Sequence, residues 1–223
     1  MKLYHLMAGM CLLAIATLSS CGNSGSSTEN CMIFGEVPGI YADYLAQRDK
    51  ISEPAQNSES DFKKASSKID ELKEQTCAKI EEAAKKFDNQ PIQIEQSEDF
   101  KIVKPVSLSF KEFANSVNAV FNVNGEVEAA KDVVIEVSEE WLKSHNVEYL
   151  YLPLLMVGCD EQGAEVTKDR IGCFSKCFKI VDGKVVLPSG TKAELQTVAY
   201  NKNSYDDYKK VKTVKLSLDT SKM

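Results

Sequence analysis

The side chains best suited to chemistry in this 223-residue sequence are five cysteines, namely Cys31, Cys77, Cys159, Cys173 and Cys177. In an exported protein such cysteines are expected to form disulfides, and five of them leave one without a partner. Spacing favours a bond between Cys31 and Cys77, which lie in the two parts of an expected helical region. It also favours a bond from Cys159 to either Cys173 or Cys177, across a polar segment, residues 160–172, that is expected to be a hairpin loop.

Metal or redox chemistry at these cysteines has weaker support. A zinc site uses four ligands, and Cys173 and Cys177 have only Cys159 as a further cysteine nearby. A thioredoxin-like centre needs a Cys-x-x-Cys pair, which the sequence lacks. His145 is the only histidine after residue 20, so a dyad with Cys159 stays open. We expect no catalytic residue, no metal and no cofactor, and keep a thiol- or metal-dependent envelope enzyme using Cys159, Cys173 and Cys177 as the alternative.

The charge balance excludes one class of partner. The sequence has 33 acidic and 27 basic residues and a net charge of −6, whereas a nucleic-acid-binding surface requires a basic stripe. Carboxylates occur as sequence neighbours, such as Asp160-Glu161 and Asp206-Asp207. Neighbours on a strand point to opposite faces, so these are expected to be solvated charges and not acid–base pairs.

The first 20 residues have the features of a signal peptide. Lys2 precedes an uncharged, mostly apolar run from Leu6 to Leu18, which is shorter than a membrane-spanning helix. The run ends in Leu18-Ser19-Ser20-Cys21, which resembles the lipobox of bacterial lipoproteins. The resemblance implies cleavage before Cys21 and attachment of acyl chains such as palmitate to that residue. Several acyl chains on one residue anchor a protein firmly, at roughly 0.8 kcal/mol for each buried methylene.

Residues 21–39 are expected to form the lipid anchor and a flexible tether. The stretch Gly22-Asn23-Ser24-Gly25-Ser26-Ser27 is rich in glycine and serine, a composition typical of flexible linkers. The style of lipobox and spacer resembles that of Bacteroidetes lipoproteins, in some of which acidic residues after the cysteine direct surface export. No acidic pair follows Cys21 here, and Gly22 differs from the aspartate that favours inner-membrane retention. The resemblance therefore implies an exported protein in the outer membrane, facing the periplasm.

Residues 40–90 are expected to be helical. Apolar residues recur with helical spacing between Phe62 and Phe87, and a shorter helix is expected from Ile40 to Ile51. The two helices would form a hairpin, with a polar connection that begins at Glu53-Pro54. Two interpretations stay open: the hairpin is a stalk that binds a partner, or it packs on its own domain.

The period changes from 3.6 to 2 after Glu98, which predicts strands. Seven or eight strands are expected in residues 98–220, including a hairpin around Asp182-Gly183 and a covered central strand in residues 147–157. Short strands separated by turns favour an antiparallel immunoglobulin-like β-sandwich. The expected class is mainly β, with a helical hairpin before the sandwich. This layout resembles that of many uncharacterised Bacteroidetes lipoproteins.

These features predict a non-enzymatic lipoprotein of the cell envelope that binds a protein or a glycan through the sandwich or the helical stalk. An inhibitor or immunity module is a further alternative that the sequence does not separate from this role. One contact patch is proposed from the sequence, formed by the aromatic residues Tyr200, Tyr205 and Tyr208 beside Asp206-Asp207.

Overall fold

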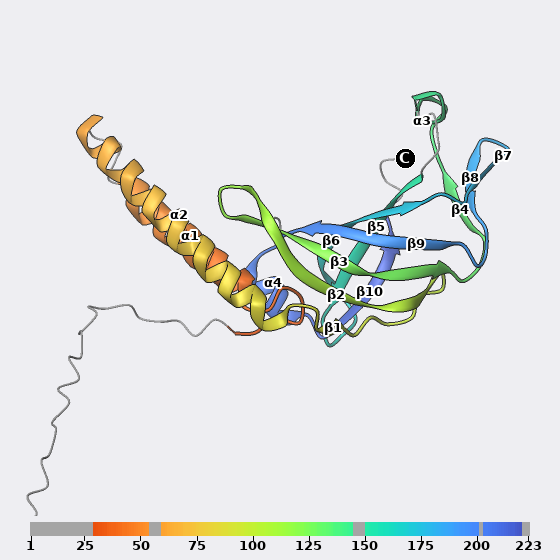
Figure 1. The fold of residues 1–223 in the computed structure, drawn as a ribbon, viewed down its shortest axis with the longest axis horizontal. Coiled ribbons are helices and arrows are strands. Elements are labelled where there is room, and N and C mark those ends of the chain that lie inside the picture. Colours follow the sequence, from red (N-terminus) through yellow and green to blue (C-terminus); the bar gives the residue numbers. More distant parts are fainter. Residues whose placement is uncertain (1–28, 54–58, 145–149, 201–202, 220–223) are drawn as a thin grey trace, which may run out of the picture.

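A computed structural model describes residues 29–53, 59–144, 150–200 and 203–219. In this part of the chain antiparallel strands predominate, and the two long helices lie at the N-terminal end (Figure 1). The expected class, mainly β with an N-terminal helical segment, is therefore confirmed. The expected signal peptide, the lipidated Cys21 and residues 21–28 of the expected tether lie outside the described residues. The rest of that range, residues 29–39, was wrongly predicted to be flexible tether. It forms a turn closed by the Cys31–Gly35 bridge and the start of a helix at Val37, because the side chains of Ile33 and Phe34 are buried in the core.

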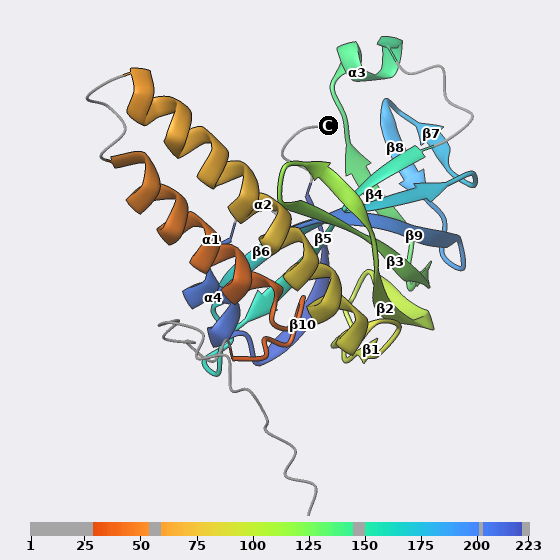
Figure 2. The ribbon, with the colours of Figure 1, turned by 60° about the vertical axis from the view of Figure 1, so that its left-hand side comes forward.

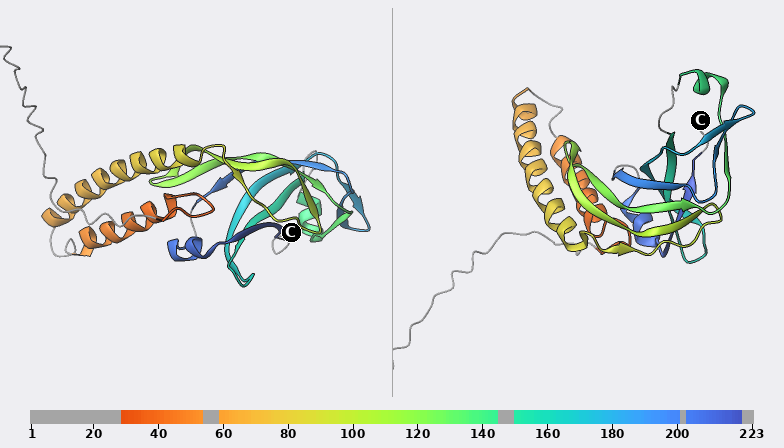
Figure 3. Two further views of the ribbon diagram at one scale, coloured as in Figure 1. Left: turned by 90° about the horizontal axis from the view of Figure 1, so that it is seen from below. Right: turned by 45° about the vertical axis from the view of Figure 1, so that its right-hand side comes forward.

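Two helices, α1 (Val37–Ser52) and α2 (Glu59–Phe87), lie side by side and project from the sheets (Figures 1 and 3). Pro38 lies in the first turn of α1, where a missing N–H group leaves no hydrogen bond unmade. The buried residues of α2 recur at helical spacing and are Ala65, Thr76, Ile80, Ala83 and Ala84. Both helices match the predicted ranges to within three residues. Among the described residues, neither of them nor any other helix is long and apolar enough to cross a membrane.

Most strands belong to one seven-stranded sheet, in which every pairing is antiparallel. In spatial order its strands are β1 (Pro91–Ile92), β2 (Phe100–Asn115), β3 (Asn118–Ala129), β9 (Lys192–Ala199), β6 (Glu165–Ser175), β5 (Leu150–Cys159) and β10 (Thr213–Leu218). Pro105 lies in β2 where the pairing with β3 shifts register, as expected for a proline that cannot donate to the ladder.

The seven-stranded sheet is strongly curved, and a short segment joins its two edges (Figure 2). Ile92 in β1 pairs with Val106 of β2 at one edge. Three residues later, the N–H group of Glu95 donates to the carbonyl of Val214 in β10, at 2.7 Å. The same stretch of chain therefore pairs with β2 through β1 and covers part of the open edge of β10 through Glu95.

A smaller sheet contains β4 (Val133–Glu136), β8 (Lys184–Leu187) and β7 (Lys179–Val181). β7 and β8 form the hairpin predicted at Asp182-Gly183, where both residues have positive φ, 49° and 74°. Such a turn matches the twist of the two strands. Val134, Ile180 and Val181 of this sheet are about half exposed, at 54%, 50% and 48%.

Two predicted boundaries were wrong. Most of the segment 160–172, interpreted as a loop, belongs to the strand β6. Residues 205–210, for which no helix was predicted, form the helix α4 (Tyr205–Lys210). The strand expected at the centre of the sheet, β5, lies next to its edge, between β6 and β10. It is covered because β10 and the bridge at Glu95 lie beyond it.

One continuous core connects the base of the helical hairpin with the sheets. Ile80 and Ala84 of α2 belong to the same buried cluster as Phe121 of β3 and Leu154 of β5. Trp141, in the short helix α3 (Glu139–Ser144), packs against this cluster. The base of the hairpin thus packs on its own domain, while its far end extends away from the sheets (Figure 1).

Candidate functional site

The helix α4 is stabilised by an N-terminal cap and by the charges at its two ends. The hydroxyl of Ser204 accepts a hydrogen bond from the N–H of Asp207 at 3.1 Å and donates one to Asp207 Oδ2 at 2.6 Å. The first turn carries acidic side chains and the last turn carries Lys209 and Lys210, in the order that the helix dipole favours. The sequence 204–210 therefore supports a helix even though the segment is short and highly charged.

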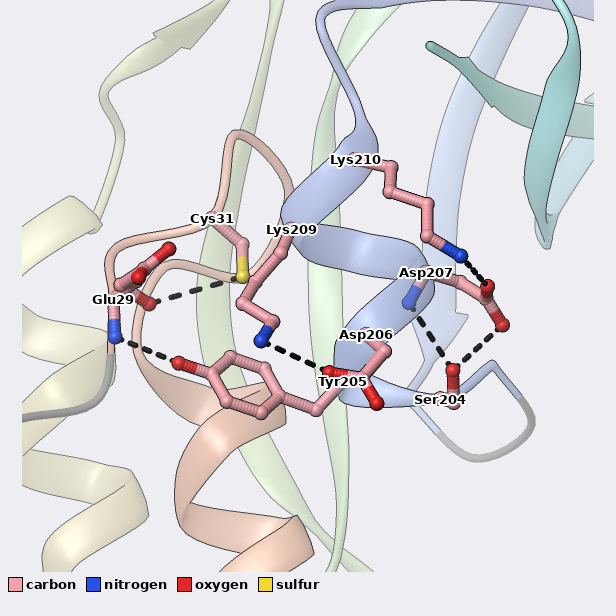
Figure 4. Close-up of polar contacts among 8 residues, drawn as sticks. All are labelled: Glu29, Cys31, Ser204, Tyr205, Asp206, Asp207, Lys209 and Lys210. Carbon is pink, nitrogen blue, oxygen red and sulfur yellow. Dashed lines mark hydrogen bonds and ion pairs between the residues drawn. The ribbon is translucent and has the colours of Figure 1, made fainter. Parts of the chain in front are cut away.

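Tyr205 holds the N-terminal segment of the described chain against α4 (Figure 4). The N–H group of Glu29 donates to the hydroxyl of Tyr205 at 2.7 Å. Lys209 Nζ lies 4.7 Å from the centre of the same ring and pairs with Asp206 at 2.9 Å. Cys31 is buried beside this contact, and its thiol donates to the carbonyl of Glu29 at 3.8 Å. Residues 29–31, which were expected to belong to the tether, are thus attached to the body at α4.

The predicted contact patch was wrong for two of its three tyrosines. Tyr200 and Tyr208 are buried, at 2% and 0% exposure, and only Tyr205 reaches the surface. Residues three positions apart lie near each other on a helix, but Tyr208 sits on the side of α4 that faces the sheet. Burial raises the pKa of both phenols, so each stays protonated. These two side chains are core residues, and they do not form a contact surface.

Phe34 lies at the centre of the buried aromatic cluster. Its ring centre is 5.1 Å from that of Phe121, 5.4 Å from that of Tyr200 and 5.7 Å from that of Tyr208. The backbone of Phe34 has a φ of 64°, which non-glycine residues rarely adopt. The tight turn from Cys31 to Gly35 directs this ring inward, so aromatic packing compensates for the unfavourable backbone.

A buried carboxylate connects α4 to the sheet. Asp169 of β6 is 4% exposed, and its Oδ1 accepts hydrogen bonds from the hydroxyl of Tyr208 at 2.6 Å and from Asn203 Nδ2 at 3.1 Å. Burial raises the pKa of Asp169 to about 6, although these two hydrogen bonds act in the opposite direction. The group is therefore ionised at neutral pH in an environment that disfavours its charge.

Two oxygen atoms beside this network have no hydrogen-bond partner in the described structure. They are Oδ2 of Asp169 and the hydroxyl oxygen of Thr167, which lies two residues earlier on the same face of β6. Buried polar atoms without partners are unusual in folded proteins. The site therefore carries an energetic cost that a purely structural contact would not need.

Comparison with known proteins identifies no relative from which a role can be transferred. No family model, curated protein or solved structure matches this chain. The chemistry of the site must therefore be argued from its own geometry.

The structure separates Cys159 from Cys173 and Cys177, so the predicted disulfide between them was wrong. In the β5–β6 pairing Cys173 lies opposite Leu152, while Cys159 lies at the other end of β5, opposite Glu165. Seven residues of strand, about 23 Å, separate the two positions, whereas a disulfide needs Cα atoms within about 7 Å. Cys177 lies beyond the end of β6 and is farther still.

The predicted bond between Cys31 and Cys77 is not formed either, because the five cysteines in the described residues are all free. The turn that contains Cys31 lies against Phe87, at the end of α2, since a Cβ on Gly35 would meet the Phe87 ring. Cys77 lies ten residues earlier, about 15 Å along the helix, and donates to the carbonyl of Ser116 at 3.6 Å.

These positions separate Cys159 from Cys173, two of the three cysteines of the enzyme alternative. The described residues contain no group of three or more His, Cys, Asp or Glu side chains that could hold a metal ion. His145, the other member of the open dyad, lies outside the described residues.

The free cysteines should differ strongly in reactivity. Burial raises the pKa of Cys173 to about 12 and that of Cys31 to about 11, and a thiol reacts as its thiolate. We expect maleimide to modify the exposed Cys177 first and Cys173 last, as read by peptide mass spectrometry after timed labelling. Cys177→Ser should remove the fast modification and Cys173→Ser should leave it unchanged. Equal labelling rates at Cys173 and Cys177 would contradict the described burial.

Sequence reasoning missed Asp169 and Thr167 because their strand was interpreted as a loop. A signal was present: Lys168 and Arg170 alternate with Thr167, Asp169 and Ile171, the period-2 pattern of a half-buried strand. Asp169 lies in the middle of the buried face of this strand, and because a carboxylate is rarely buried, the segment was interpreted as polar and exposed.

Proposed function

We propose that this chain is a non-enzymatic lipoprotein of the bacterial outer membrane, facing the periplasm, that binds a protein or a glycan. The observation that carries the proposal is the contact between the N–H group of Glu29 and Tyr205, which attaches the chain to α4 next to the expected tether. Together with the resemblance of Leu18-Ser19-Ser20-Cys21 to a lipobox, this contact supports a body held near the membrane by its α4 side.

The length of the tether limits how far the body stands from the membrane. Glu29 lies eight positions after Cys21, a span of at most about 28 Å for fully extended chain. The mature chain would have a net charge of −7, because removal of residues 1–20 removes Lys2, so the anionic surface of a membrane would not attract it. Acyl chains alone would then hold the protein in place.

The parts that lie away from α4 are available for binding. The far end of the helical hairpin and the three-stranded sheet lie at opposite ends of the molecule, with α4 between them (Figure 1). The two sheets would act as an immunoglobulin-like sandwich whose loops and exposed aliphatic side chains meet a partner. The half-exposed Val134, Ile180 and Val181 are of the kind found at protein contacts.

A binding role has more support than a thiol- or metal-dependent enzyme. Cys159 lies about seven strand residues from Cys173, and burial holds the thiol of Cys173 in its unreactive protonated form. An inhibitor or immunity module would be one form of the proposed protein binding.

Anchoring is tested by labelling cells that express the chain with an alkyne analogue of palmitate. We expect the wild-type chain to take up the label and to sediment with membranes, and Cys21→Ser to lose both properties. Cys177→Ser, which removes another exposed thiol, is the matched control and should keep the label. Labelling that persists in Cys21→Ser, or a wild-type chain without label, would refute the anchor. Cross-linking in intact envelopes would then identify what the anchored chain binds.

A further inference from the structure

A small pocket of about 180 Å³ opens where the N-terminal segment meets the end of α2 and the first strands. Its walls include Asn30, Met32 and Gly35 from the turn after the tether, and Phe87 and Gln90 from the end of the helix. This volume is well below the ~300–1,000 Å³ of pockets that hold drug-sized ligands, so it suits a single ring.

Gly35, one of the lining residues, lets Phe87 and Asn30 pack closely against the turn. Gly35 has a φ of +57°, and a Cβ at this position would lie 2.6 Å from Cδ1 of Phe87 and 3.1 Å from the side-chain oxygen of Asn30. A side chain at residue 35 would therefore clash with the ring of Phe87 and crowd the side chain of Asn30. Without a side chain at residue 35, Phe87 and Asn30 both lie close to the turn, and both line the pocket.

The lining selects an uncharged ligand with many hydroxyl groups. None of the described residues that line the pocket carries a charged side chain. Asn30 and Gln90 are exposed amides, and Gln90 Nε2 donates to the carbonyl of Lys86 at 2.5 Å, which leaves its oxygen available as an acceptor. Amides that donate and accept beside an aromatic ring suit a sugar ring, whose edge carries hydroxyl groups and whose face carries polarised C–H groups.

We propose that this pocket binds one uncharged sugar ring of an envelope glycan. The inference deepens the proposed function, on which it rests, by naming the ligand class and the binding residues. The pocket adjoins the residues that follow the tether, so the glycan would be bound on the side of the body nearest the membrane. Phe87 contacts the face of the ring, and Asn30 and Gln90 bind its hydroxyl groups.

The test is a titration of the purified full chain in detergent with the disaccharide of N-acetylglucosamine and, separately, with maltose and with glucuronic acid. Binding is followed by saturation-transfer NMR and by the amide signal of Gly35. We expect at least one neutral sugar to bind saturably at millimolar concentration and to shift the Gly35 signal. The anionic glucuronic acid should bind at least tenfold more weakly, because the described lining offers no cation.

Variants locate the binding. Asn30→Ala combined with Gln90→Ala should weaken the neutral sugar tenfold or more, and Met32→Lys at the exposed rim should do the same. Gln75→Ala removes an exposed amide on α2, away from the pocket, and should leave affinity unchanged.

Three results would overturn the proposal: no saturable binding of either neutral sugar, binding that the double variant leaves intact, or a preference for glucuronic acid. Because the chain is in detergent, a failure of Cys21 acylation would not affect this titration. The proposal of a sugar-binding pocket and the proposal of a lipid anchor can therefore be refuted independently.

Discussion

Phe34→Ala is expected to lower the free energy of unfolding by about 3–5 kcal/mol, the range for removing a buried phenylalanine ring. The ring is 1% exposed and contacts Phe121, Tyr200 and Tyr208, so its removal leaves a cavity bordered by three aromatic side chains. The loss should also release the turn from Cys31 to Gly35, because packing of this ring is what holds residue 34 at a φ of 64°. Guanidinium chloride denaturation followed by circular dichroism measures the change.

Phe62→Ala is the matched control for this substitution. Phe62 lies near the start of α2 and is 65% exposed, so the same change in side chain should alter stability by no more than about 0.5 kcal/mol. If the two variants lost the same stability, the N-terminal turn would not be part of the core. The aromatic contacts of Phe34 would then not be what joins the turn to α4 and the sheet.

Local periodicity was enough to predict the helices and several strands. The stripe from Phe62 to Phe87 and the Asp182-Gly183 turn are patterns whose physical causes lie within a few residues of each other. The same holds for Pro105, which marked an irregular pairing in β2.

The strand β6 carried a local signal that was not recognised, but the errors over the cysteines and Tyr208 came from information that no short stretch of sequence contains. Whether Cys159 meets Cys173 depends on the register of β5 against β6, and this register is set by the sheet as a whole. The direction of Tyr208 depends on where α4 docks, and its partner Asp169 is 39 residues earlier. A polar or charged side chain facing the core is the case in which patterning fails, and the candidate site is built from such residues.

The helix α4 makes contacts on two sides. One side of the helix holds the start of the described chain through Tyr205, and the other side is tied to the sheet through Tyr208 and Asp169. The Asp169 contact therefore links the N-terminal segment, through α4, to the strand β6.

Asp169→Asn is expected to stabilise the protein at neutral pH and to remove part of its pH dependence. The pKa of Asp169 is raised from 3.8 to about 6, so between these values the folded chain holds a proton that the unfolded chain has released. Stability from this group is fully present below about pH 4, falls as the pH rises, and levels off above about pH 6. At 1.36 kcal/mol per pKa unit the total loss is about 3 kcal/mol. Asparagine keeps an oxygen for the hydroxyl of Tyr208 and carries no charge, so the variant should avoid that loss.

The measurement is the difference in unfolding free energy between Asp169→Asn and wild type from about pH 4 to about pH 8. Hydrogen bonds to lysine side chains lower the pKa of Glu126 and Glu165, and these groups act in the opposite direction, but they contribute equally to both proteins and cancel. The difference should grow by about 3 kcal/mol between pH 4 and pH 6 and then stay constant. Asp43→Asn, an exposed change on α1, should give a difference that stays within about 0.5 kcal/mol at every pH. A difference for Asp169→Asn that does not change with pH would mean that Asp169 does not titrate in the folded chain over this interval. In that case burial of its charge would not be what sets the stability of the contact between α4 and β6.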